Sequence, residues 1–276
     1  MRWRVVSAVT SKDLATVMRN RGIRIPLIAA PTVILILLPI VLVTGGDILA
    51  GSPVADLSSS AESAQSFAER FAPSADAVTG RSANANFAAF VLEVFLAPLY
   101  LLIPLMVSTV IAADSFAGER DRGTLEALLH TPTSDRELFA GKFLAAWIPA
   151  MVVSLGGFVV YSVVANAVAW PSIGQVFFPN PTWLVLAFFV TPGIAGLGLG
   201  MMVIVSSRVQ SVQAAHQFGS LVVLPIVILL IGQVSGAILL DLRVVTLMGV
   251  LVWVLAIVVL RTATTTFRRE HLAARL

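Results

Sequence analysis

The chain has 276 residues, of which 58% are hydrophobic and only 12% are charged, and its formal net charge is +3. Soluble domains carry about 25% charged residues, so this composition excludes an ordinary soluble protein and indicates several membrane spans. The sequence contains no cysteine, which excludes disulfides, thiol catalysis and cysteine-ligated metals.

Residues 1–24 are predicted to form an amphipathic helix on the cytoplasmic membrane surface. They contain six basic residues and a single acid, Asp13. Apolar residues recur there at spacings compatible with one helical face. They are Trp3, Val6, Val9, Leu14, Val17 and Met18. A signal peptide is the alternative, but the charged leader is long and the apolar run that follows is long enough to span a bilayer.

We predict an all-α polytopic membrane protein, with one transmembrane domain over residues 1–276 and six transmembrane helices. The spans are predicted at residues 25–44, 87–113, 143–168, 184–205, 218–232 and 245–260. Prolines within the first span predict a kinked helix. Glycines in the fourth span predict a face where helices approach closely. These are Gly193, Gly196, Gly198 and Gly200.

The segments between the spans differ in composition. Residues 45–86 are rich in Ser and Ala and are predicted to form an external loop or lid. A charge-free linker joins the third and fourth spans, and Trp170 and Trp183 flank it as interfacial aromatic residues do. The remaining predictions are a cytoplasmic turn at 206–217, an external re-entrant segment at 233–244 and a cytoplasmic tail at 261–276.

Basic residues are concentrated on one side of this six-span scheme. The amino segment, residues 114–142, the turn and the tail hold 6, 4, 1 and 4 of the 18 Lys and Arg residues. Because basic residues are retained on the cytoplasmic face, both termini are predicted to lie in the cytoplasm. The protein itself is predicted to lie in the plasma membrane. The positive charge therefore requires no nucleic acid partner.

Residues 114–142 form a charged segment between the second and third spans, with ten charged residues in 29 positions. Such a segment must lie outside the bilayer, where ionised side chains are not costly. Thr124 is placed to cap a short helix, with Glu126 in its first turn. Ser134 and Glu137 form the pattern of a capping box, which predicts the start of the next helix.

The same segment resembles the signature between the second and third spans of type-2 ATP-binding cassette (ABC) exporter permeases. The matching residues are Glu119, Arg120, Arg122, Gly123, Thr124, Leu125, Glu126, Leu129, Pro132, Ser134, Glu137, Leu138, Gly141 and Lys142. Residues 206–225 resemble the family more weakly. The resemblance implies that 114–142 contains a coupling helix that rests in a cleft of a separate ATPase. It also implies that residues 1–24 form an elbow helix and that a short external helix precedes the last span.

The resemblance further implies which residues contact the ATPase and how the complex is built. The contact residues would be Glu119, Arg120, Arg122, Gly123, Thr124, Leu125, Glu126, Leu129, Arg208 and Gln210. An ABC ATPase dimer would bind two permease chains, as a homodimer or as a heterodimer with a related permease, among membrane lipids. This chain has no nucleotide-binding motif, so we predict that it is not an enzyme and holds no cofactor or metal, with ATP and Mg bound in the partner.

Glu93 is the only clear carboxylate within a predicted span. An acid at this depth lies on a substrate path or has a structural role, and the sequence does not decide between them. An intramembrane enzyme or a proton-coupled secondary carrier using Glu93 is therefore the alternative function. A purely structural membrane subunit is a third hypothesis, and the sequence leaves the transported substrate open.

Overall fold

The computed structural model describes residues 2–49, 83–121, 133–209, 212–235, 237, 238 and 240–266. Within these residues every regular element is a helix, and six helical stretches are long and apolar enough to cross a membrane. The predicted all-α polytopic class is therefore confirmed. The six stretches are Arg21–Gly45, Ala85–Gly118, Asp135–Ile173, Pro181–Ser206, Gln213–Gln233 and Leu242–Thr265.

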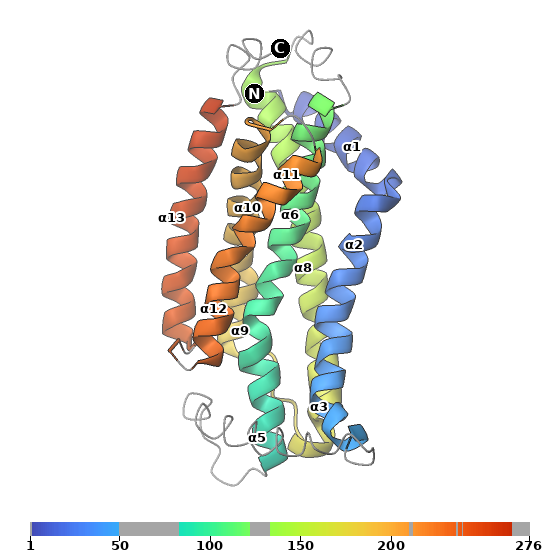
Figure 1. Ribbon diagram of the computed structural model, residues 1–276, viewed down its shortest axis with the longest axis vertical. Coiled ribbons are helices and arrows are strands. Elements are labelled where there is room, and N and C mark those ends of the chain that lie inside the picture. The colour runs from blue at the N-terminus through green and yellow to red at the C-terminus, as the bar shows by residue number, and fades with distance from the viewer. Residues whose placement is uncertain are drawn as a thin grey trace.

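The amino-terminal helix, α1 (Trp3–Arg19), is separated from the first span by a break at Asn20. The Asn20 side chain accepts a hydrogen bond from the Gly22 N–H at 3.0 Å and so caps α2 (Arg21–Thr32). The first span continues as the π-helical turn η1 (Val33–Leu37) and as α3 (Leu38–Leu49). Figure 1 shows α1 at the end of the bundle from which α2 departs.

The second and third spans are longer than hydropathy predicted. The second consists of α5 (Ala83–Ala89), the π-helical turn η4 (Phe90–Phe95) and α6 (Leu96–Asp121). The third is α8 (Asp135–Ile173), with 39 residues. At 1.5 Å per residue α8 is about 58 Å long, nearly twice the roughly 30 Å hydrocarbon core of a bilayer. The first turns of α8 therefore lie outside the apolar layer.

The fourth span consists of α9 (Pro181–Val185), the π-helical turn η5 (Leu186–Val190) and α10 (Thr191–Ser206). The fifth consists of α11 (Val212–Gly219), the 3-10 turn η6 (Ser220–Val223) and α12 (Leu224–Val234). The fifth span thus begins inside the predicted cytoplasmic turn 206–217. The predicted fifth span was too short to cross about 30 Å as a helix, and upstream residues complete it.

The prediction of a re-entrant helix at residues 233–244 is wrong for the part of that segment that the structure describes. Helix α12 continues to Val234, and the last helix, α13 (Leu242–Thr266), begins at Leu242. The described residues between them, 235, 237, 238, 240 and 241, are not helical. The Ile238 N–H donates to the Gly232 carbonyl at 2.9 Å, which closes the connection too tightly for another helix.

The second and fourth spans form the centre of the bundle. In the most apolar 18 residues of each span, the share of buried residues is 67% in the second span and 61% in the fourth. The corresponding shares are 22%, 19% and 22% in the first, fifth and sixth spans. The predicted glycine packing is confirmed, but on two faces of α10. A Cβ at Gly198 would lie 2.6 Å from Leu105 of α6, and one at Gly200 would lie 2.9 Å from Val259 of α13.

Candidate functional site

The structure describes three of the predicted contact residues, Glu119, Arg120 and Arg208. Helix α6 continues through Glu119 and Arg120 to Asp121, so their backbone is helical. Arg208 is exposed in the turn after α10. Outside the described residues lie Arg122, Gly123, Thr124, Leu125, Glu126, Leu129 and Gln210, together with the predicted cap at Thr124. Their role as an ATPase contact remains a prediction.

The predicted capping box at the start of α8 is confirmed. The Glu137 N–H donates to Ser134 Oγ at 3.3 Å, and the Ser134 N–H donates to Glu137 Oε2 at 3.2 Å. Two backbone N–H groups at the helix start are thereby satisfied. The helix that leaves the charged segment 114–142 is thus fixed at its first turn by residues of that segment.

Glu137 has a second role that the sequence analysis did not predict, because it also binds the beginning of the chain. The Arg2 N–H donates to Glu137 Oε1 at 2.5 Å, and Arg2 Nη2 donates to Oε2 at 3.3 Å. These bonds from Arg2 lower the pKa of Glu137 to about 2. Glu137 lies in the first turn of α8, outside the apolar layer, and is therefore an anion at neutral pH.

One turn further along α8, Gly141 allows α1 to approach closely. A Cβ at Gly141 would lie 2.7 Å from Val9 Cβ and 3.2 Å from the Val6 carbonyl oxygen, so only glycine fits without displacement. The Thr10 hydroxyl shares its one proton between the Val6 carbonyl of its own helix at 2.9 Å and the Gly141 carbonyl at 3.0 Å. Gly141, one of the residues of the signature, therefore lies where α1 crosses α8.

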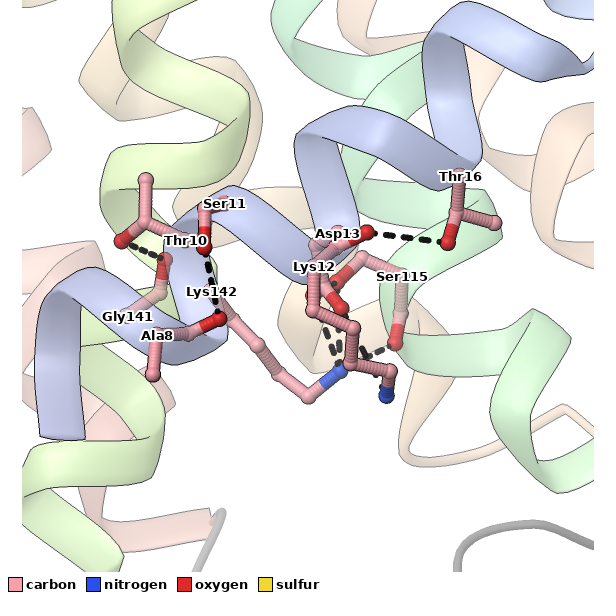
Figure 2. A network of polar contacts seen from close by, with 9 residues as sticks. All are labelled: Ala8, Thr10, Ser11, Lys12, Asp13, Thr16, Ser115, Gly141 and Lys142. Atoms are coloured by element: carbon pink, nitrogen blue, oxygen red, sulfur yellow. Dashed lines mark hydrogen bonds and ion pairs between the residues drawn. The ribbon is translucent and has the colours of Figure 1, made fainter.

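Lys142, the next residue, is the centre of a buried polar cluster that joins three helices (Figure 2). Its Nζ donates to the Ser115 carbonyl at 2.7 Å, to Ser115 Oγ at 3.2 Å and to Asp13 Oδ2 at 3.4 Å. The Ser115 hydroxyl in turn donates to Asp13 Oδ2 at 2.7 Å. Asp13 belongs to α1, Ser115 to α6 and Lys142 to α8.

The cluster is deeply buried, and its charges are matched. Lys142 is 1% exposed, and Asp13 and Ser115 are each 5% exposed. The ammonium group lies 5.3 Å from the centre of the Phe116 ring, a favourable distance for a cation–π contact. Lys12 Nζ lies 3.7 Å from Asp13 Oδ1 at the exposed edge. Lysine is almost never fully buried unless it is paired, so this burial identifies a specific contact.

The residues predicted to share one apolar face of α1 separate in the structure. Val6 and Val17 are buried, but Trp3 is 68% and Met18 is 54% exposed. Asp13 occupies the buried stripe because Lys142 and Ser115 provide it with polar partners. Hydropathy does not predict that a polar residue such as Asp13 faces the protein. Its partner Lys142 is also 129 residues away in the sequence.

Glu93 lies at a π-helical turn towards the other end of the bundle, where its side chain is partly buried. Three successive backbone carbonyls of this turn accept side-chain hydrogen bonds from three other elements. Leu92 accepts from Tyr161 at 2.5 Å, Glu93 from Trp183 at 2.8 Å, and Val94 from Gln233 at 2.7 Å. The role of the Glu93 carboxylate itself remains a prediction.

Trp183 is not an interfacial aromatic residue as predicted, since it is 1% exposed. Its ring packs against the rings of other buried aromatic residues, with centroid distances of 4.9 Å to Tyr161 and 5.0 Å to Phe178. Its N–H is satisfied within the bundle by the Glu93 carbonyl. The position of Trp183 beside the charge-free linker predicted the end of a span but not the direction in which its side chain points.

Comparison with known proteins adds one finding to this geometry. The family model described as "ABC-2 family transporter protein" matches residues 8–271. The match includes the six membrane-spanning stretches and most of α1. A search of curated proteins gives no match to the chain. Among the described residues no group of three or more His, Asp or Glu side chains is arranged to hold a metal.

Proposed function

The chain belongs to the ABC-2 family of transporter proteins as a multi-pass membrane permease, and from this premise we propose that it couples ATP hydrolysis in a separate ATPase subunit to substrate export. The chain carries the path through the membrane, and its partner carries the ATP and Mg chemistry. The observation that carries this proposal is the family match over residues 8–271, together with six membrane-length helices.

We propose that the end of the bundle carrying the charged segment faces the cytoplasm. In Figure 1 the end of α6, the start of α8, α1 and the end of α13 lie at the same end of the molecule. Most described basic residues belong to these parts of the chain, whereas Arg243 lies at the opposite end, at the start of α13. The positive-inside rule then supports a cytoplasmic position for both termini.

We assign the ATPase contact to the charged segment at that end. Its acidic and basic residues would orient docking, and its leucines would fill an apolar cleft of the partner. The contact residues proposed are Glu119, Arg120, Arg122, Gly123, Thr124, Leu125, Glu126 and Leu129, with Arg208 and Gln210 as a second, smaller contact. Two permease chains with two ATPase subunits make the proposed complex.

Co-purification tests this function. The tagged chain, extracted in mild detergent from its native membrane, is expected to bring down an ABC ATPase. Glu119→Lys combined with Glu126→Lys is expected to lose the ATPase and its permease-dependent activity while the chain still inserts. Arg243→Glu is the matched control, because it reverses one exposed charge at the opposite end of the bundle.

Two outcomes would contradict the proposal. A chain that purifies without any ATPase under conditions that preserve its fold would favour the alternative that uses Glu93. Retention of ATPase and stimulation in the doubly reversed variant would show that the charged segment is not the contact. In the first case, Glu93→Gln is the variant to examine, because a carrier or enzyme that uses this carboxylate would lose its activity without any ATPase present.

A further inference from the structure

The two ends of the charged segment meet at one point, and α1 is part of the same contact. Ser115 is the second residue of segment 114–142 and Lys142 is its last. Lys142 Nζ bonds to the Ser115 carbonyl, and both residues bond to Asp13 of α1. We call these three residues the joint. It closes the base of the segment that we propose to contact the ATPase.

The chemistry of the joint determines how precisely the helices are held. The lysine ammonium has three N–H donors, and three acceptors lie within 3.4 Å of it. The Ser115 hydroxyl accepts from Lys142 and donates to Asp13, so its two roles are also used. A fully satisfied buried polar network specifies one arrangement, since any sliding of a helix leaves a buried charge unpaired at high cost.

Two further contacts fix the direction in which α1 crosses α8. Along α1 the attachment points are Arg2, Thr10 and Asp13, and their partners on α8 are Glu137, Gly141 and Lys142. The points extend over roughly 16 Å of α1 but only about 8 Å of α8 at the helical rise, so the two helices cross at an angle. The Arg2 side chain is 61% exposed, and an exposed ion pair contributes little. The joint differs from this attachment because both of its charged partners are buried.

We propose that Asp13, Ser115 and Lys142 are positioning residues for energy coupling: they make α1, the end of α6 and the start of α8 one rigid body. This inference rests on the proposed function. A displacement of the charged segment by the ATPase is then delivered to α1 and, through the capped break at Asn20, to the first span. Without the joint, the same displacement is lost as sliding between helices.

The first test removes both charges of the joint while keeping its shape. Asp13→Asn with Lys142→Met removes both charges of this buried pair together, and exchanging a buried ion pair for uncharged residues of similar volume is often tolerated in folding. The double variant is expected to insert and to co-purify with the ATPase in wild-type amounts. Its permease-dependent ATPase rate is expected to fall about fivefold or more, the lower range of coupling between distant sites.

The matched control is Lys12→Gln, which removes a positive charge from the neighbouring residue. Lys12 is 57% exposed and lies 3.7 Å from Asp13, and its loss leaves the bonds between Asp13, Ser115 and Lys142 in place. We expect wild-type coupling from this variant. Ser115→Ala is the second variant if the double change fails to fold, because it keeps the charge pair and removes two hydrogen bonds. It is expected to reduce coupling in the same direction.

A distance measurement separates coupling from mere stabilisation. The chain has no cysteine, so spin labels attached before it is combined with the ATPase report only on Ser11→Cys of α1 and Arg136→Cys of α8, both of which are exposed. In the otherwise wild-type complex this distance is expected to stay constant between the nucleotide-free state and the state trapped with ATP and vanadate. In the Asp13→Asn, Lys142→Met background the distribution is expected to broaden.

Several results would overturn the inference, and they differ from failure of the proposed function. If the double variant keeps wild-type coupling and a narrow label distribution, the joint does not position the helices. A large change of the label distance on ATP binding in the otherwise wild-type protein would show that α1 and α8 move separately. A wild-type chain that binds no ATPase at all would instead refute the proposed function, and the coupling role with it.

Discussion

At the scale of single residues, the clearest physical constraint is the crossing of α1 over α8. The contact depends on the absence of a side chain at Gly141, because Val9 Cβ and the Val6 carbonyl occupy the space that a Cβ would need. Close-packed interiors tolerate extra atoms poorly. The same glycine belongs to the signature that identified the segment, so the structure gives this part of the signature a packing role.

We predict that Gly141→Ala destabilises the purified chain by about 1–3 kcal/mol, the usual cost of overpacking. Gly156→Ala is the matched control in the same helix, because nothing lies within 4 Å of its added Cβ. The measurement is thermal unfolding in detergent. The control is expected to be neutral or slightly stabilising, and equal behaviour of the two variants would show that α1 does not pack closely on α8.

At the scale of elements, the π-helical turn η4 depends on donors from other helices. Pro98 has no N–H, so the carbonyl of Val94, four residues earlier, lacks its ordinary helical partner. Gln233 lies near the end of α12 and is 2% exposed. Its side-chain Nε2 donates to the Val94 carbonyl at 2.7 Å. The fifth span is otherwise weakly buried, so one side-chain amide attaches its far end to the central helix.

We predict that Gln233→Leu lowers stability by about 0.6–1.7 kcal/mol, from the average to the largest value of hydrogen bonds between membrane helices. In a Pro98→Ala background the cost is expected to shrink, since alanine returns the N–H that the Val94 carbonyl lacks. Unfolding of the four proteins of this double-mutant cycle provides the measurement. An equal cost of Gln233→Leu in both backgrounds would contradict the explanation.

At the scale of the whole molecule, the even number of spans places both described ends of the chain at one end of the bundle (Figure 1). The same end carries the joint and the charged segment. The second span runs from this end to its π-helical turn η4, and with the fourth span it forms the centre around which the other spans pack. A movement imposed at the joint therefore begins at the end of the most deeply packed helix.

We predict the sidedness of the bundle from a labelling experiment. Ser11→Cys on α1 is expected to react with a membrane-impermeant maleimide only after the cells are permeabilised, and Arg243→Cys is expected to react in intact cells. Both positions are exposed, and the cysteine-free parent is the blank. The opposite pattern would reverse the proposed topology.

Hydropathy and residue spacing were enough to predict the class of fold, the number of spans and the capping box at Ser134, because each depends on residues close together in the sequence. The boundaries were less accurate. Helix α8, for example, continues beyond the apolar layer, from its cap at Ser134 to its cap at Gly174. Among the described residues of 233–244 no separate external helix precedes the last span, because polar residues there mark an exposed connection as readily as a helix.

Contacts between distant segments were decided only by tertiary structure. Lys142 was part of the recognised signature, yet its pairing with Asp13 depends on how α1 and α8 rotate about their axes and cross. The same holds for Trp183 and Gln233, whose partners are carbonyls that any residue type provides. A backbone carbonyl carries no sequence identity, and a helix crossing has no local pattern. Both are fixed only when the helices pack.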